Sequence, residues 1–217
     1  MAGINPEQFQ QLLGQLFAAI NNHEPAALAK INALLEKIPE EPNLLHLAGL
    51  ASADQNQLSA AIDYLLRSLS RQSEQPEVHN NLANVYAKQG NNLLAEKHYR
   101  QALQLNPDFQ DALKNLGLLL ISVSPEAAVV ELDRAIAQNS KDIGALTGLG
   151  DAHKALENFE LSTEYYQRAL EINPNHANAN NNLGMVFNEL GEIKKAISCF
   201  QKTIEIQPNS SNAYWCL

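Results

Sequence analysis

The side chains that could do chemistry in this sequence are few, and their spacing favours no reaction. Six histidines stand at positions 23, 46, 79, 98, 153 and 176. No two are spaced i, i+4, as two ligands on one helix face would be. The sequence therefore predicts no catalytic residue, no metal site and no cofactor.

Three other patterns have a structural interpretation. Glu40-Glu41 resembles a carboxylate pair, but it falls in an expected turn, where solvated carboxylates are normal. Gly148-x-Gly150 lacks the third glycine of a phosphate loop and follows no strand, so it fails the test for that motif. We expect His153 to be a hydrogen-bonded packing residue and Cys199 to be a small packing residue.

The elements that must position these residues recur every 34 residues. A Leu-(Gly/Ala) pair begins at positions 82, 116, 149 and 183, spaced 34, 33 and 34 residues apart. Prolines at positions 39, 107, 174 and 208 follow the same lattice. A fixed period of this size indicates stacked supersecondary units, whose function lies on a surface shared by many repeats.

Composition supports an all-α chain and excludes several partners. Of the 217 residues 45% are hydrophobic, and strand-like runs of Val, Ile and Thr are absent. The net charge is −9 without a Lys/Arg-rich run, so binding of nucleic acid or an anionic membrane is not expected. The amino terminus lacks the layout of a signal peptide and no stretch of 18 apolar residues exists, which predicts a cytoplasmic protein.

The spacing resembles the tetratricopeptide repeat, a helix-turn-helix unit of 34 residues. Residues 76–109 match it best, with Leu82, Ala83, Tyr86, Gly90, Ala95, Tyr99, Ala102 and Pro107 at repeat positions 7, 8, 11, 15, 20, 24, 27 and 32. The resemblance implies an all-α, right-handed superhelical solenoid of antiparallel helix pairs. Its first helices would line a concave groove.

The resemblance also divides the chain into one array over residues 1–217. The expected repeats are 42–75, 76–109, 110–142, 143–176 and 177–210, preceded by a degenerate copy at 8–41 and followed by the start of another at 211–217. In the degenerate copy, Leu13-Gly14 and Phe17 fit the packing positions. The copy 110–142 has lost one residue near Ser124-Pro125.

Several glycines have a physical reason under this register. Small residues at positions 8, 20 and 27 let two helices approach closely, so Gly150 and Gly184 should lie at helix contacts. Gly90 and Gly191 suit the left-handed residue that ends a first helix.

The resemblance places a peptide-binding groove on first-helix positions 2, 5, 6, 9, 12 and 13. The polar candidates there are Glu77, Asn80, Asn81, Asn84, Asp111, Lys114, Asn115, Asp151, Lys154, Asn178, Asn181, Asn182 and Asn188. Asn81, Asn115 and Asn182 share position 6, interrupted by Gly148, and resemble the asparagine ladder of O-linked N-acetylglucosamine transferases. An amide can bond any peptide unit, but it can equally bond neighbouring backbone, so both roles stay open.

One partner class is not expected. Arrays that grip the acidic carboxyl-terminal tail of heat-shock chaperones use cations at positions where this chain has Asn80, Gly144 and Gly148. A groove without those cations, in a chain of charge −9, should repel such a tail.

The carboxyl end suggests a continuation. Residues 211–217 spell the start of another first helix, and Ala213 to Leu217 resemble the junction between bacterial arrays and a sulfotransferase domain. Either the chain was cut from a longer protein or this end docks on a partner, including weak self-association through the tip. We therefore expect a non-enzymatic scaffold that binds protein or peptide in its groove. The alternative is the substrate-recruiting or regulatory arm of a larger sulfotransferase or glycosyltransferase.

Overall fold

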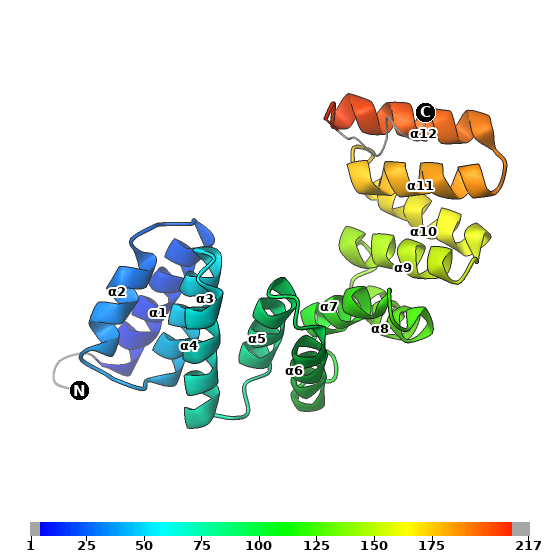
Figure 1. Ribbon diagram of the computed structural model, residues 1–217. Helices are drawn as coiled ribbons and strands as arrows, with labels where there is room; N and C mark the ends of the chain where they lie inside the picture. The colour runs from blue at the N-terminus through cyan, green and yellow to red at the C-terminus, as the bar shows by residue number, and fades with distance from the viewer. Residues whose placement is uncertain (1–4, 210–217) are drawn as a thin grey trace. The chain divides into compact units, whose positions relative to one another are not determined.

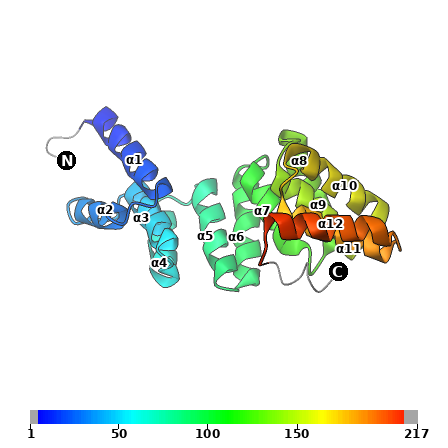
Figure 2. The ribbon, with the colours of Figure 1, turned by 90° about the horizontal axis from the view of Figure 1, so that it is seen from above.

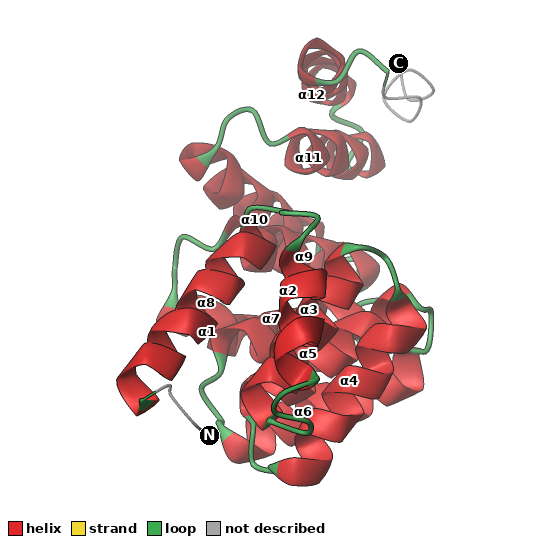
Figure 3. Ribbon diagram, turned by 90° about the vertical axis from the view of Figure 1, so that its left-hand side faces the viewer, coloured by secondary structure: helices red, strands yellow, loops and turns green. Residues whose placement is uncertain are grey.

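The computed structural model describes residues 5–209 of the chain. Over this range twelve α-helices are joined by short turns, and no strand is present (Figures 1 and 3). The chain divides into two compact units, unit 1 (Met1–Phe109) and unit 2 (Gln110–Leu217). The predicted all-α class is confirmed, whereas a single array over 1–217 stays a prediction.

Unit 1 consists of helices α1 to α6 (Figure 1). Their bounds are α1 Pro6–Asn21, α2 Ala27–Leu35, α3 Pro42–Asp54, α4 Leu58–Arg71, α5 Pro76–Lys88 and α6 Asn92–Leu105. Helices α3 and α4 pack as a pair, as do α5 and α6, and α4 also packs on α5. These helices have only 9 to 16 residues each, so this stacking supplies the burial that an isolated helix would lack.

Unit 2 repeats the arrangement with helices α7 to α12, which Figure 2 shows from above. Their bounds are α7 Gln110–Leu120, α8 Pro125–Gln138, α9 Ile143–Ala155, α10 Phe159–Ile172, α11 Ala177–Glu189 and α12 Ile193–Ile206. Helix α7 has 11 residues, whereas α9 and α11 have 13. The repeat with the missing residue thus has a shorter first helix.

Close helix contacts form where position 8 faces position 24. A Cβ added to Gly150 would lie 2.5 Å from Cε1 of Tyr166, and one added to Gly184 would lie 2.7 Å from Cε1 of Phe200. Both aromatic rings are buried. The predicted contacts at Gly150 and Gly184 are confirmed, because no side chain fits between these helices.

Four of the inner turns share a left-handed residue at repeat position 15. Gly90 and Gly191 have φ of 83° and 74°, as predicted. Asn56 and Glu157 take the same conformation, with φ of 60° and 58°. After each of these residues, the next amide donates to the carbonyl five residues earlier, at 2.8–2.9 Å, which completes the helix end.

The amino-terminal helix α1 departs from the expected register. Gly14 is exposed and a Cβ there would meet nothing within 4 Å, while Phe17 is 48% exposed. The buried residues of α1 are Leu13, Leu16, Ala19 and Ile20. The predicted packing of Gly14 and Phe17 is therefore wrong: α1 buries a different face against unit 1.

Two further expectations concern the chain end and membrane helices. The Tyr214–Leu217 tip, proposed for self-association, lies outside residues 5–209. Within that range, every helix is too short or too polar to cross a lipid bilayer.

Candidate peptide-binding site

A pocket of about 350 Å³ opens in unit 1 on the side of its first helices α3 and α5. It is lined by Gly49, Leu50, Ala53, Asp54, Leu65, Asn81, Asn84, Val85 and Lys88. The apolar members form a surface suited to one aliphatic side chain. The amides and the two charged groups add hydrogen-bonding partners, which is the usual make-up of a ligand pocket.

The pocket depends on a glycine. A Cβ at Gly49 would lie 2.6 Å from Cγ of Leu65, so Leu65 of the second helix α4 reaches past α3 to this surface. Leu65 is fully buried and Val85 of α5 is 4% exposed. Two of the sequence-predicted groove residues, Asn81 and Asn84, lie in this lining.

Asn81 is held by a histidine of the preceding repeat. Its Nδ2 lies 2.8 Å from Nε2 of His46 on α3, and with this amide orientation the ring nitrogen accepts. Burial lowers the pKa of His46, against a smaller opposing effect of Glu77, so the ring is neutral near pH 7 and able to accept. The Asn81 amide is thus fixed in place before any ligand arrives.

Asn84 accepts a hydrogen bond from a tyrosine on the second helix of its own repeat. The Tyr99 hydroxyl on α6 donates to Oδ1 of Asn84 at 2.6 Å. Burial raises the pKa of Tyr99 to about 12, which keeps the hydroxyl protonated as a donor. Asn84 itself is exposed and contributes to the pocket lining.

In unit 2 the corresponding residue is Asp151 on α9. Oδ1 of Asp151 accepts from the Tyr166 hydroxyl and, at 2.8 Å, from Nδ2 of Asn182 on α11. Lys154 lies 3.7 Å from the same oxygen. Burial, followed by the Asp151 charge, raises the pKa of Tyr166. Three sequence-predicted groove residues, Asp151, Lys154 and Asn182, are therefore brought together in one polar cluster.

Positions 9 and 24 change together along the repeats. Where position 24 is a tyrosine, position 9 is a hydrogen-bond acceptor, and where position 24 is apolar, position 9 is apolar too. The five pairs are Leu50 with Leu65, Asn84 with Tyr99, Leu118 with Leu132, Asp151 with Tyr166, and Met185 with Phe200. Consecutive repeats thus alternate between apolar and polar side chains on the first-helix side. Sequence reasoning missed this, although aligning the repeats would have revealed it.

The interruption at Gly148 has a steric cause. A Cβ there would lie 2.7 Å from Cδ2 of Leu118 and 3.1 Å from Cδ1 of Leu132. Leu118 of α7 lies over this position, so an asparagine there would have to displace the Leu118 side chain. The run of asparagines at position 6 is therefore broken by packing.

Lys114, the predicted groove lysine at position 5, forms two ion pairs within unit 2. Nζ of Lys114 lies 3.2 Å from Oδ2 of Asp142 and 3.3 Å from Oδ1 of Asp111. These hydrogen bonds outweigh partial burial and raise the pKa of Lys114. Asp142 also caps α9 by accepting from the Ala145 amide at 3.0 Å. Lys114 thus fastens α7 to the start of α9.

The remaining candidates are spread over different environments. Asn80, a predicted groove residue, is 5% exposed, so little of its side chain is accessible to a ligand. Asn181 donates to Oδ1 of Asn182 at 3.3 Å and to Sδ of Met185 at 3.7 Å. Glu77, Asn178 and Asn188 are exposed and Asn115 is half-buried.

Two packing predictions have different outcomes. His153 is 8% exposed and stacks on Tyr165 with ring centroids 5.4 Å apart, but its Nδ1 has no hydrogen-bond partner among the described residues. The predicted packing role is confirmed, and the predicted hydrogen bond is not made through Nδ1. Burial raises the pKa of the Cys199 thiol, as suits a packing residue.

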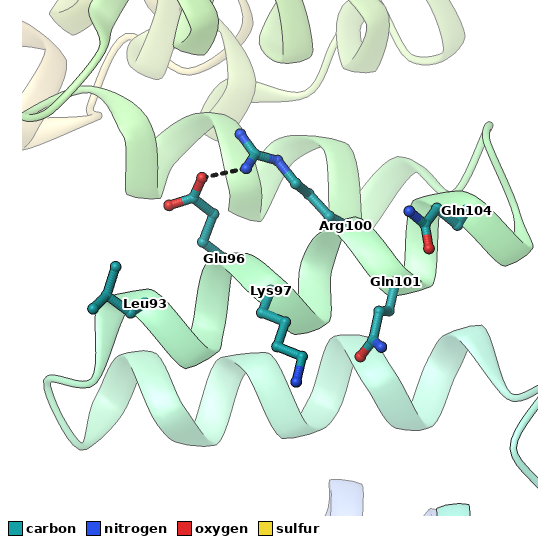
Figure 4. A pocket seen from close by; sticks show the side chains of 6 residues that line it. All are labelled: Leu93, Glu96, Lys97, Arg100, Gln101 and Gln104. Carbon is teal, nitrogen blue, oxygen red and sulfur yellow. Dashed lines mark ion pairs between the residues drawn. The ribbon is translucent and has the colours of Figure 1, made fainter.

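A second hollow, of about 490 Å³, lies along α6 (Figure 4). Its residues are Leu93, Glu96, Lys97, Arg100, Gln101 and Gln104, all from that one helix. Glu96 and Arg100 form an ion pair of 2.6 Å across it. Leu93 is 82% exposed, so the hollow offers little apolar burial and is the weaker candidate.

Comparison with known families and proteins agrees with this geometry. Residues 76–109 and 142–209 match the tetratricopeptide repeat family. Over 112 residues the chain is 31% identical to a DnaJ homolog subfamily C member 7 homolog of Schizosaccharomyces pombe, covering 49% of this chain and 24% of that protein. Over 101 residues it is 30% identical to human tetratricopeptide repeat protein 12, covering 43% and 14%. The match thus spans less than a quarter of either relative.

Solved structures share the fold. A tetratricopeptide repeat protein from Parabacteroides merdae aligns with a TM-score of 0.78 at 20% identity, over 96% of this chain and 83% of that one. YrrB, described as a tetratricopeptide repeat protein with an unusual peptide-binding site, aligns with a TM-score of 0.70 at 22% identity, over 85% and 96%. The repeat spacing, the helix pairs and these matches agree, and the chain is a tetratricopeptide repeat protein.

Proposed function

We propose that this protein is a scaffold that binds an extended segment of another protein on the first-helix side of unit 1. The pocket lined by Leu50, Asn81 and Asn84 carries the proposal. Tetratricopeptide repeats support a protein-interaction role, and YrrB is described as having a peptide-binding site. The polar cluster of Asp151, Lys154 and Asn182 in unit 2 is a second proposed contact surface, considered by itself.

The proposed ligand places one aliphatic side chain in the pocket. Leu50, Ala53, Leu65 and Val85 supply the apolar contact, and burying such a side chain contributes on the order of 1.5–3 kcal/mol. The Asn81 and Asn84 amides, each already fixed by an internal hydrogen bond, bond the ligand main chain. Because their rotamers are set in advance, binding costs less conformational entropy.

Charge selects what flanks that side chain. Asp54 is engaged by Nδ1 of His23 at 2.6 Å, whereas Lys88 makes no ion pair with any residue between 5 and 209. A carboxylate of the ligand therefore fits near Lys88. The doubly acidic chaperone tail stays an unfavoured partner, because the chain has Asn80, Gly144 and Gly148 where such arrays have cations. The transferase-arm alternative stays a prediction.

The test uses a peptide selected from a random display library with the whole chain. Ala53→Phe fills the pocket and should weaken that peptide by at least about tenfold, or roughly 1.4 kcal/mol. Ala137→Phe is the matched control, since Ala137 is exposed on the second helix α8. Unchanged affinity in Ala53→Phe, with the fold intact by circular dichroism, contradicts the proposed site.

A further inference from the structure

Two histidines meet inside unit 1, away from the pocket lining. His79 on α5 and His98 on α6 place their Nδ1 atoms 3.0 Å apart. The rings stack with centroids 5.3 Å apart, and Tyr86 stacks on the other side of His98 at 5.6 Å. Two imidazole nitrogens thus face each other between paired helices.

The surroundings of this pair favour neutral rings. His79 is 9% exposed and His98 is 8% exposed. Burial lowers the pKa of both, and for His98, with the neighbouring His79 and Lys97 adding to it, to about 4. Neutral imidazole is the form that binds metal ions, so no proton has to be removed near pH 7.

A third polar group, the Gln101 side chain, lies beside His98. Oε1 of Gln101, one turn after His98 on α6, is buried and has no hydrogen-bond partner among the described residues. The Gln101 side chain lies close enough to His98 to act against the lowering of its pKa. A buried acceptor without a donor is costly, by about 1–3 kcal/mol, and a cation beside it would remove that cost.

We propose that His79 and His98 bind a borderline divalent cation, with Zn²⁺ as the representative, through their Nδ1 atoms. Two nitrogens bound to one zinc at about 2.0–2.1 Å and a tetrahedral angle lie roughly 3.3–3.4 Å apart. The observed 3.0 Å needs a small opening and a turn of the two rings, so that both lone pairs meet the ion. Gln101 Oε1 and water complete the coordination, since no group of three His, Cys, Asp or Glu side chains suited to a metal exists within residues 5–209.

Binding requires a tautomer change but no net proton loss. Without metal, one ring donates its Nδ1–H to the Nδ1 of the other. With zinc on both Nδ1 atoms, that proton moves to Nε2 of the same ring, so both rings carry Nε2–H. This change gives a signature that a purely structural histidine pair would not show.

The experiment titrates ZnCl₂ into the metal-free whole chain and follows affinity by competition with a chelating dye. One zinc per chain is expected, with affinity at least about tenfold lower in His79→Gln and in His98→Gln. Gln101→Glu offers a carboxylate at the third position and should tighten binding, a gain that unfolding cannot mimic. His153→Gln, a buried histidine with no histidine beside it, is the matched control.

Nitrogen-15 NMR of the wild-type chain keeps the proposal testable if a histidine variant does not fold. Zinc should shift the Nδ1 resonances of two histidines together. The proposal is overturned if zinc shifts no pair of Nδ1 resonances, or if both His79→Gln and His98→Gln bind as wild type. It is also overturned if His23→Gln alone abolishes binding, because the exposed His23–Asp54 pair would then be the site.

Discussion

The Tyr99 hydroxyl donates a hydrogen bond of 2.6 Å to Oδ1 of Asn84, so a residue of a second helix fixes a side chain in the lining of the pocket. Tyr166 does the same for Asp151 in unit 2. Tyrosines of the second helices therefore orient the polar side chains on the first-helix side. A ligand meets amide and carboxylate groups whose orientation is already determined.

Removing these hydroxyls should destabilise each repeat by a different amount. Tyr99→Phe should cost about 0.5–1.5 kcal/mol, and Tyr166→Phe about 1.5–3 kcal/mol, because the Asp151 acceptor is charged. Urea unfolding measures both. Asn84→Leu combined with Tyr99→Phe recreates the apolar pairing of Leu50 with Leu65 and should recover part of the loss. A strictly additive double variant would show that the two positions are not coupled.

Filling the helix contact at Gly150 should destabilise unit 2. Gly150→Leu meets the Tyr166 ring at once and should cost about 1–3 kcal/mol, despite the better helix propensity of leucine. Gly14→Leu is the matched control, because nothing lies within 4 Å of a Cβ there. Thermal unfolding should show a lower melting temperature for the first variant and an unchanged or higher one for the second. Equal effects would contradict the contact.

Relieving the left-handed turn at Glu157 should stabilise the protein. Glu157 has φ of 58°, a conformation that costs a residue with a Cβ about 1 kcal/mol and that glycine adopts freely. Glu157→Gly should therefore raise the melting temperature slightly. Gly191→Ala, the reverse change at the same repeat position, should lower it. A lower melting temperature for Glu157→Gly would show that Glu157 makes a contact worth more than the strain.

Alkaline pH should weaken the fold through the buried tyrosines. Burial raises the pKa of Tyr99 to about 12 from an ordinary value of 10. The folded state thus keeps a proton that the unfolded state has lost, so this stability is fully present below pH 10 and is lost as pH rises from 10 towards 12. Urea midpoints across this range test the sign. In Tyr99→Phe the decline should be smaller; an identical decline would assign it to other groups.

The parts of the fold that follow from one repeat could be predicted from the sequence. Gly90 and Gly191 end helices because glycine adopts positive φ without strain, and Gly150 faces Tyr166 because the 34-residue lattice fixes both positions. The same Leu-Gly pattern at Leu13-Gly14 predicted a helix contact at Gly14 that the structure does not have. The pattern is present there, but α1 buries another face, which depends on its neighbours and not on its own sequence.

The parts that depend on contact between helices could not be predicted in this way. His79 and His98 are 19 residues apart on different helices, and a search for i, i+4 spacing sees one helix only. The hydrogen-bond partners of the position-6 asparagines could not be predicted either. The partners of Asn81 and Asn182 lie in the preceding repeats, so they are identified only from the structure. The left-handed conformation of Glu157 could not be predicted from the residue type, because glutamate is unfavourable in the conformation that the turn imposes.

The alternation of polar and apolar pairs limits how this gene can change in length. Excising residues 143–176 would bring the repeat of Asn182 against the repeat of Leu118, and the amide would face a methyl group where it now bonds Asp151. Removing two consecutive repeats would keep the alternation. Recombination in this array should therefore be tolerated best in steps of two repeats, so that the heritable module is a four-helix segment of about 68 residues.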